Sequence, residues 1–317
     1  MSRFISCDWG TSRLRLRLVE RSTCRILADH ASDEGIQRCA ALHPDAERRR
    51  VHLGAALERG IAALVADDGA DLPVVISGMA SSNLGWRALP YAELPAPIDG
   101  STLRSLDFRH AGRQVRLISG LRDASDIMRG EETELIGLFA QPARHSLAEN
   151  AVAVLPGSHS KHVRLLGGRI VEFSTFLTGE LFGLLAQQST LAAPPSPSFD
   201  REAFVAGVQA SQSGGLSAAL FQTRARTVLG VLAAEHGRTF LSGALIGAEV
   251  LALRAAPACP VVLAAGDRFA REYALALAEL LPEVPVVALP PAEVATAAVR
   301  GHARLLERPG PDSSPRG

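Results

Sequence analysis

The chain has 317 residues, with 33 Lys and Arg residues balanced by 33 Asp and Glu residues, so its formal net charge is zero. A length of this order suits two domains of ordinary size. The neutral balance gives no general electrostatic reason to expect nucleic acid or an anionic membrane as a partner. A hydrophobic fraction of 47% excludes a disordered chain.

The four cysteines show neither a CxxC pair nor metal-ligand spacing, which predicts reduced thiols and a cytoplasmic protein. The first eight residues lack the apolar segment of a signal peptide. The longest apolar stretch, 240–253, is short and carries Glu249. This stretch predicts a buried helix and not a membrane span.

The first half of the chain opens with a strand, a turn and a returning strand. Residues 4–9 form a short apolar run that is typical of a buried strand. After the turn at 10–12, residues 13–18 alternate arginine with leucine, which is the period of a half-exposed strand. Further strands are predicted at 24–28, 72–76 and 115–119, and helices at 45–66 and 130–140.

The second half opens in the same way, which predicts two related domains although no residue-level repeat is visible. A strand at 151–155, a polar turn and strands at 161–166 and 169–173 follow one another. The remaining predicted elements are helices at 178–188, 201–208, 216–235 and 240–255, a strand at 261–264, a helix ending at 281, a strand at 284–289 and a helix at 292–306. We expect an N-terminal domain at 1–140, a C-terminal domain at 141–307 and a disordered tail at 308–317.

The first turn combines groups that suit a phosphate. Gly10 lets backbone N–H groups approach an anion, and Thr11 and Ser12 add hydroxyl donors. Asp8 offers a carboxylate for Mg²⁺, which takes one or two protein oxygens and keeps most of its waters. The alternative is an ordinary turn in which Asp8 is a local acceptor, because the pattern is short.

The second turn, at 156–161, offers N–H groups, two hydroxyls, an imidazole and the only lysine of the chain. A nucleophilic serine is disfavoured, because the G-x-S-x-G pattern is absent and no helix follows directly. A compact ammonium suits a phosphate better than a guanidinium does, although a single lysine can also be the remainder of an arginine-rich composition. The candidate phosphate-binding residues here are Gly157, Ser158, His159, Ser160 and Lys161.

Three acids begin the helix predicted after Arg129, where the helix dipole favours them. Either Glu131 or Glu132 could accept a proton from a substrate hydroxyl, and the alternative is a solvated helix terminus.

Three further places are candidates, each weak when taken alone. Gly179 stands at a helix N-terminus, where it permits close approach to a ligand. Gly243 and Gly247 lie within an apolar helix, where close helix packing or a flat nucleotide site would explain them. Ala265 and Gly266 form a strand-to-helix turn of the kind that binds ligands in α/β folds.

Seven segments resemble, in order, those of the 2-dehydro-3-deoxygalactonokinases, which are sugar-acid kinases of the actin-like and hexokinase-like ATPase superfamily. Together they span nearly the whole chain apart from the tail. They are DWGTSRLR (8–15), SGMASSNLGW (77–86), MRGEETELIG (128–137), LPGSHSKHV (155–163), FLTGEL (176–181), FLSGALIGAEV (240–250) and AAG (264–266).

The resemblance implies an α/β fold of two ribonuclease-H-like domains with an interdomain cleft, and ATP and Mg²⁺ as cofactors. It places the first phosphate loop at 8–12, with Asp8 at the metal, and the second at 157–161, where the usual Asp-x-Gly is missing. It places the adenosine side at Ala265 and Gly266, with Gly243 and Gly247 near the base. Glu131 is favoured over Glu132 as the base, and Lys161 would offset charge on the transferred group. The candidate sugar-acid residues are Ser82, Asn83, Trp86 and Arg129.

The implied activity is phosphorylation of the C6 hydroxyl of 2-dehydro-3-deoxy-D-galactonate in D-galactonate catabolism. The partners are then a small sugar acid and ATP, with no nucleic acid or membrane, and a homodimer is left open. The alternatives are a kinase for another sugar or sugar acid, a phosphoanhydride hydrolase on the same scaffold, and an actin-like filament protein. A sugar-sensing repressor is disfavoured because the first strand begins at Phe4, which leaves no room for a DNA-binding helix-turn-helix before it.

Overall fold

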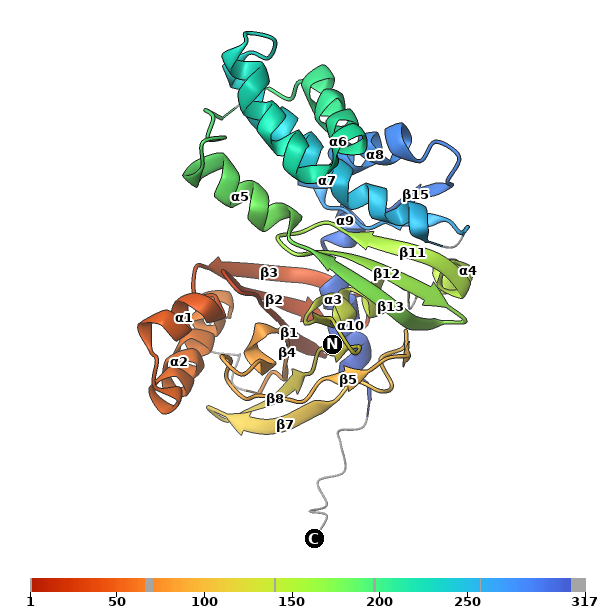
Figure 1. Cartoon of the computed structure of the whole chain (residues 1–317). Coiled ribbons are helices and arrows are strands. Elements are labelled where there is room, and N and C mark those ends of the chain that lie inside the picture. The colour runs from red at the N-terminus through yellow and green to blue at the C-terminus, as the bar shows by residue number, and fades with distance from the viewer. Residues whose placement is uncertain (1, 66–70, 140, 196–197, 257, 309–317) are drawn as a thin grey trace. The chain divides into compact units, whose positions relative to one another are not determined.

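The computed structural model describes residues 2–65, 71–139, 141–195, 198–256 and 258–308 (Figure 1). The chain divides into two units. The first contains the described residues of 1–148, 167–172 and 295–317, and the second contains those of 149–166 and 173–294. The chain thus leaves the first unit and returns to it.

The main sheet of the first unit has the strand order β3-β2-β1-β4-β8-β7. Strands β1, β2 and β3 form an antiparallel meander, β1, β4 and β8 run parallel, and β7 returns antiparallel to β8. The strands are β1 (Arg3–Trp9), β2 (Leu14–Glu20), β3 (Arg25–Ser32), β4 (Val74–Gly78), β7 (Ser105–His110) and β8 (Arg113–Ile118).

The sheet of the second unit repeats this order as β13-β12-β11-β14-β15. Strand β12 is antiparallel to β11, whereas β14 is parallel to both β11 and β15. The strands are β11 (Asn150–Leu155), β12 (Ser160–Leu166), β13 (Arg169–Phe176), β14 (Val261–Leu263) and β15 (Val286–Ala288). A meander of three strands followed by two parallel strands is the ribonuclease-H-like arrangement, so the prediction of two such α/β folds is confirmed.

The alternating pattern of β2 has the predicted consequence. Leu14, Leu16 and Leu18 are buried in the first unit, and Arg15 between them is exposed. On one face of the sheet lie α1 (Ile36–Leu42) and α2 (Ala46–Leu64), drawn in red and orange in Figure 1. Asp45 caps α2 by accepting a hydrogen bond of 2.8 Å from the Arg48 N–H.

The last helix, α10 (Ala297–Leu306), lies in the first unit, whereas the sequence-based division placed it in the C-terminal domain. It packs against α3 (Glu131–Phe139) and against β1 and β4. The physical reason is a pair of glycines that lets the two helix backbones touch. A Cβ atom at Gly137 would lie 1.8 Å from the Ala297 carbonyl oxygen, and one at Gly301 would lie 2.0 Å from that of Thr133.

The segment between β4 and α3 is more regular than its prolines suggest. Short strands β5, β9 and β10 form a small sheet, and β6 pairs with the start of β13. Each of these strands is only two residues long. The prolines near them therefore suggest irregular loop, and the sequence pattern does not reveal the strands. Their bounds are β5 (Ala92–Glu93), β6 (Ala96–Pro97), β9 (Leu121–Arg122) and β10 (Ile127–Met128).

Most helices of the second unit begin where the sequence predicts. The helices expected at 201–208 and 216–235 are joined in α6, which breaks its helical geometry only at Gly215, where φ is +73°. No helix in the described part of the chain is long and apolar enough to cross a membrane. The tail expected to be disordered falls, apart from Arg308, outside the described residues. The remaining elements are α4 (His145–Glu149), α5 (Thr178–Gln188), α6 (Arg201–Val228), α7 (Gly237–Leu251), α8 (Asp267–Leu280), α9 (Pro291–Val294) and short 3-10 helices at Met79–Ser81, Pro142–Arg144, Ala234–His236 and Ala252–Ala255.

Candidate functional site

The β1–β2 turn of the first unit is closed and docked through its backbone. The Gly10 N–H donates to the Arg13 carbonyl at 2.9 Å, so this N–H is used within the turn. The carbonyls of Gly10 and Thr11 accept from the N–H groups of Ile36 and Gln37 at the start of α1. Thr11 and Ser12 keep partly or fully exposed positions at the tip. The turn can therefore present hydroxyls while its carbonyls point to α1.

Asp8 lies just before this turn, in register with Arg15 on β2. The Arg15 Nη1 is 3.1 Å from the Asp8 Oδ2, and 29% of the Asp8 side chain remains exposed. Burial raises the pKa of Asp8, and Arg15 acts in the opposite direction. The negative charge of Glu131, at the start of α3, also raises the pKa of Asp8.

Glu132 and Glu134 join Asp8 and Glu131 in one acidic cluster at the start of α3. Glu132 is 1% exposed, and its carboxylate accepts from the N–H of Gly130 at 2.7 Å and from the Thr133 hydroxyl at 3.1 Å. Burial, and then the charge of Glu131, raise its pKa to about 7. Burial, and then the charges of Asp8, Glu131 and Glu132, raise the pKa of Glu134 to about 8. A cluster of like charges at low exposure is a place for a cation or for a proton acceptor.

Glu131 differs from Glu132 in exposure and in its partner. It is partly exposed, and its Oε2 accepts from the N–H of Arg129 at 3.0 Å. Both carboxylates thus accept from the N–H groups of the two residues directly before α3 and hold the chain where it enters the helix. Glu132 uses both carboxylate oxygens inside the protein, which leaves Glu131 better suited to a substrate.

The residues here fit a hydrated Mg²⁺ better than a protein-enclosed one. In the described part of the chain, no group of three or more His, Cys, Asp or Glu side chains could hold a metal ion. Mg²⁺ bound with a nucleotide takes one or two carboxylates plus phosphate oxygens and water. Asp8, whose carboxylate is partly exposed, can supply one such carboxylate.

Arg129 is fixed by two neighbours that the sequence did not single out. Its Nη1 donates to the carbonyl oxygen of Ser81 at 2.8 Å and to the Ser81 hydroxyl, and its guanidinium lies 4.1 Å from the centre of the Tyr91 ring. Its Nε and the Ser82 hydroxyl are buried, with no hydrogen-bond partner within the described residues. Such unpaired donors suit an anionic or hydroxylated ligand.

The other two predicted sugar-acid residues are placed differently. Asn83 is exposed, next to Ser82. Trp86 is only 5% exposed and packs edge-on against Trp9 and Phe108, with ring centres 6.4 and 5.2 Å apart. Its place in the core accounts for Trp86 without a ligand.

The β11–β12 turn of the second unit is built like the first. The Gly157 N–H donates inward, here to the Ser160 hydroxyl at 3.3 Å. Helix α5 covers the turn: the Glu180 N–H donates to the Ser158 carbonyl at 3.0 Å. Gly179 makes this contact feasible, because a Cβ atom there would lie 2.4 Å from the Gly157 carbonyl oxygen.

The two basic residues of this turn are both held by protein groups. The His159 Nε2 is 2.6 Å from the Glu180 Oε2, and 40% and 49% of the two side chains remain exposed. Lys161 is 3% exposed, and its Nζ donates to the His159 carbonyl at 3.1 Å. Lys161 therefore acts on the backbone of the turn in this structure.

The predicted adenosine-side residues separate into two groups. Gly243 and Gly247 face α6, since Cβ atoms there would lie 2.1 Å from the Phe204 carbonyl oxygen and 2.6 Å from the Ser211 hydroxyl oxygen. Close helix packing, one of the two explanations that the sequence allowed, accounts for both glycines. Ala265 is buried two residues after the end of β14, and Gly266 precedes α8 with open space where a Cβ would lie. The N-terminus of α8 at Gly266 can face an anion or a ribose.

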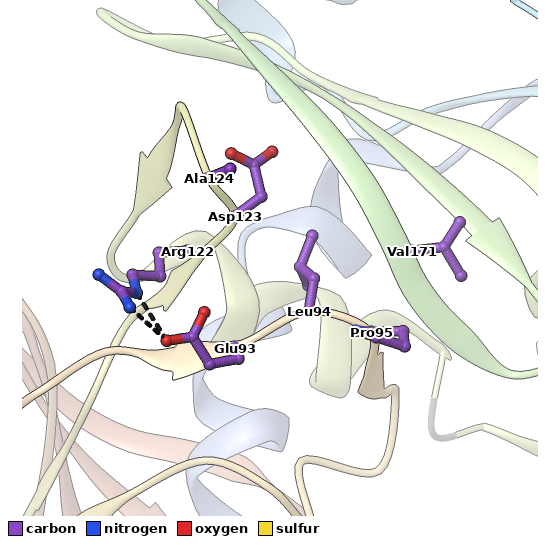
Figure 2. A pocket seen from close by; sticks show the side chains of 7 residues that line it. All are labelled: Glu93, Leu94, Pro95, Arg122, Asp123, Ala124 and Val171. Atoms are coloured by element: carbon purple, nitrogen blue, oxygen red, sulfur yellow. Dashed lines mark hydrogen bonds and ion pairs between the residues drawn. The ribbon is translucent and has the colours of Figure 1, made fainter.

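A cavity of about 570 Å³ lies elsewhere in the first unit (Figure 2). It opens at the end of the small sheet opposite to Tyr91 and Arg129, because Leu94 follows β5 and Asp123 follows β9. The Arg122 guanidinium there is paired with Glu93 at 2.5 Å. None of the predicted site residues lines this cavity, and we assign no ligand to it. Its lining residues are Glu93, Leu94, Pro95, Arg122, Asp123, Ala124 and Val171.

Several residues that shape these sites were given no role by the sequence analysis. Ser81 and Tyr91 hold Arg129, and neither carried a signal in its local sequence. Glu134 was counted among the three acids of the helix start, and it belongs to the acidic cluster. Glu249 lies beneath the second turn, in contact with Tyr273, and its signal was a lone charge in the apolar stretch 240–253.

Comparisons with known proteins identify the family of the chain. A family model described as 2-keto-3-deoxy-galactonokinase matches residues 8–301. The 2-dehydro-3-deoxygalactonokinase of Escherichia coli (strain K12) is 34% identical over 298 residues, which cover 90% of this chain and 93% of that protein. A crystal structure from Sinorhizobium meliloti, described as a 2-dehydro-3-deoxygalactonokinase protein, superposes with a TM-score of 0.75 at 31% identity and covers 96% of this chain and 99% of its own. The chain therefore belongs to the 2-keto-3-deoxy-galactonokinase family.

Proposed function

We propose that this protein is an ATP-dependent 2-dehydro-3-deoxygalactonokinase, which phosphorylates the C6 hydroxyl of 2-dehydro-3-deoxy-D-galactonate in galactonate catabolism. The observation that carries the proposal is the match to the family over residues 8–301. The named activity of the Escherichia coli relative supports the substrate. We also place the enzyme in the cytoplasm, where ATP is available.

The chemistry follows from the two turns and the acidic cluster. Phosphoryl transfer needs positioning and charge neutralisation more than covalent chemistry. We assign phosphate binding in the first unit to Thr11 and Ser12, and in the second to the N–H groups of Ser158 and His159. The N–H groups of Gly10 and Gly157 already donate within their own turns, so these glycines act by allowing close approach.

We assign the base to Glu131, which takes the proton of the C6 hydroxyl as that oxygen attacks the γ-phosphorus of ATP and the bond between this phosphorus and ADP breaks. Arg129 would bind the carboxylate of the sugar acid, and Ser82 one of its hydroxyls. The Arg129 Nε and the Ser82 hydroxyl are buried without a hydrogen-bond partner within the described residues, which costs free energy that a bound sugar acid would recover. Lys161 would favour negative charge near the second turn through its ammonium. Mg²⁺, when bound near Asp8, would supply charge neutralisation for the nucleotide.

The test is ADP release by the purified enzyme across a panel of 2-keto-3-deoxy sugar acids and neutral sugars. We expect strong stimulation by 2-dehydro-3-deoxy-D-galactonate and negligible release without acceptor. The Asp8→Asn variant serves as the control for contaminating ATPases, and it should be folded and nearly inactive. Phosphate release that does not depend on any sugar acid would instead support the phosphoanhydride hydrolase.

A further inference from the structure

A buried hydrogen-bond network lies beneath the β11–β12 turn, and it centres on Glu249 of α7. Glu249 is 2% exposed. Its Oε1 is 3.0 Å from the Nε2 of His162, and its Oε2 accepts from the hydroxyl of Tyr273 at 2.7 Å and from that of Thr178. Three donors thus converge on one carboxylate in the interior of the second unit.

The network continues from Tyr273 into the turn. The Tyr273 hydroxyl oxygen is 2.9 Å from the Ser160 hydroxyl oxygen, and the Ser160 hydroxyl accepts from the Gly157 N–H. A tyrosine hydroxyl has a single proton, and an ionised carboxylate can only accept. Because Tyr273 donates to Glu249, Ser160 donates to Tyr273, although the Ser160 hydroxyl oxygen also lies 3.5 Å from the Gly157 carbonyl oxygen. The carboxylate thus directs the Ser160 proton away from the Gly157 carbonyl, and the Gly157 N–H donates to the Ser160 hydroxyl oxygen.

The same carboxylate also holds the cover of the turn. Thr178 is the first residue of α5, and the two residues that follow it contact the turn: Gly179 lies against the Gly157 carbonyl, and the Glu180 N–H donates to the Ser158 carbonyl. Ser160 and His162 lie two residues apart on β12 and therefore share one face of the strand. Glu249 thus fixes the turn from its base and from its covering helix.

We propose that Glu249 is a positioning residue for nucleotide binding, acting through Tyr273 and Ser160 on one side and through Thr178 on the other. This inference rests on the proposed function, because it takes the turn at 157–161 to bind ATP phosphates. A buried carboxylate is seldom the most stabilising choice for a core position, and apolar packing would hold α7 and α8 together as well. What an apolar side chain cannot do is orient the hydroxyls that set the backbone of the turn.

The experiment compares Glu249→Gln, Tyr273→Phe and Thr178→Val with the wild type in ADP binding by calorimetry and in steady-state kinetics. We expect Kd for ADP and KM for ATP to rise at least tenfold in each variant, while KM for the sugar acid stays within twofold. Thr178→Ser keeps the hydroxyl and should restore wild-type ADP binding. Asp200→Ala removes the cap of α6 in the same unit, where Asp200 accepts from the Ala203 N–H, and should leave both nucleotide constants unchanged.

The double variant Glu249→Gln with Tyr273→Phe separates positioning from simple loss of stability. If both residues act through Ser160, their effects should not add. The double variant should then have the same Kd for ADP as whichever single variant binds ADP more weakly. A folded Tyr273→Phe variant whose Kd for ADP lies within twofold of the wild type would overturn the proposal. This variant allows the test to be made even if Glu249→Gln does not fold. Because ADP binding needs no sugar acid, a wild type that binds ADP but phosphorylates no acceptor would refute only the proposed reaction. A wild type that binds no ADP would refute both.

Discussion

At the scale of single residues, the structure separates two adjacent acids that the sequence could not. Glu132 is buried with both carboxylate oxygens hydrogen-bonded, whereas Glu131 is partly exposed. We therefore expect Glu131→Gln to lower kcat by about 10²- to 10⁴-fold, since that is the usual contribution of a general base. The measurement is the rate of sugar-acid phosphorylation at saturating substrates.

Glu132→Gln is the matched control for this prediction. A glutamine side-chain oxygen can still accept from the Gly130 N–H, and the change removes one charge from the acidic cluster. Its kcat should fall less than that of Glu131→Gln. The opposite ranking, in variants with unchanged circular dichroism, would transfer the role of base to Glu132.

Arg129 offers a second test at this scale. The contacts with Ser81 and Tyr91 hold a planar guanidinium, which a lysine ammonium cannot replace. We expect Arg129→Lys to raise KM for the sugar acid by about one to two orders of magnitude, the loss of roughly 1.5–3 kcal/mol from a charge-assisted bond. KM for ATP should change little, and an equal rise in both constants would contradict the assignment to the sugar acid.

His302 gives a prediction about stability. It is fully buried beside Ser6, with its Nδ1 2.7 Å from the Ser6 hydroxyl oxygen, and burial lowers its pKa to about 3. The unfolded chain, with a histidine pKa of about 6.5, then binds more protons between pH 3 and pH 6.5. Stability must therefore fall as the pH drops through this window, by up to about 1.4 kcal/mol per pH unit, and His302 has no effect above it.

The measurement for His302 is the free energy of unfolding in urea at pH 5 and at pH 7.5. His302→Gln keeps a polar partner for Ser6 but does not titrate. The decrease in stability between the two pH values should be smaller in the variant than in the wild type. If the free energy of unfolding decreased equally in the two proteins, His302 would have to take up its proton at pH 5 in the folded state as well as in the unfolded chain.

Sequence reasoning at this scale found residues with unusual chemistry and missed their partners. Asp8 and the acids at 131–132 could be predicted because strand-end turns and helix starts have recognisable compositions. Tyr91 and Ser81 could not, since nothing in their local sequence distinguishes them, and their role comes from a contact with Arg129. Trp86 shows that one residue can fit two accounts: a tryptophan in a polar segment suggests a ligand, and its packing against Trp9 accounts for its place without one.

At the scale of elements, the contact of α3 with α10 depends on two glycines. We expect Gly301→Ala to lower the free energy of unfolding by several kcal/mol, because its Cβ would overlap the Thr133 carbonyl oxygen at 2.0 Å. Gly183→Ala in α5 is the control, since no atom lies within 4 Å of a Cβ there. It should be neutral or stabilising by up to about 1 kcal/mol, the helix propensity that alanine gains over glycine. Urea unfolding of both variants measures the difference.

Most elements could be predicted from periodicity, and those that were missed have a common physical cause. The leucine–arginine alternation of β2 and the apolar runs of β1 and β11 encode their burial directly. Strands β5, β6, β9 and β10 have two residues each, which is too short for any period to be seen. Their extended shape comes from pairing with neighbours and not from their own residue pattern.

At the scale of the whole molecule, the repeated opening of strand, turn and strand was sufficient to predict two related units. It was not sufficient to predict that the chain returns to the first one. Helix α10 has an amphipathic pattern that would fit the surface of either sheet. The close backbone contact between Gly301 and Thr133, which are 168 positions apart in the sequence, decides that α10 packs in the first unit. No local pattern encodes that choice.

This interrupted topology leads to a prediction about fragments. A fragment of residues 149–294 contains the whole second unit together with residues 167–172, which connect β12 to the rest of β13, so we expect it to fold alone. Residues 1–148 lack α10, which leaves the apolar side of α3, including Ile136, without its cover of Val299 and Leu305. That fragment should be aggregation-prone or unfolded, and attaching 295–308 through a flexible linker should restore a cooperative unfolding transition. Circular dichroism and limited proteolysis of the three fragments measure this, and cooperative unfolding of 1–148 by itself would contradict the assignment of α10 to the first unit.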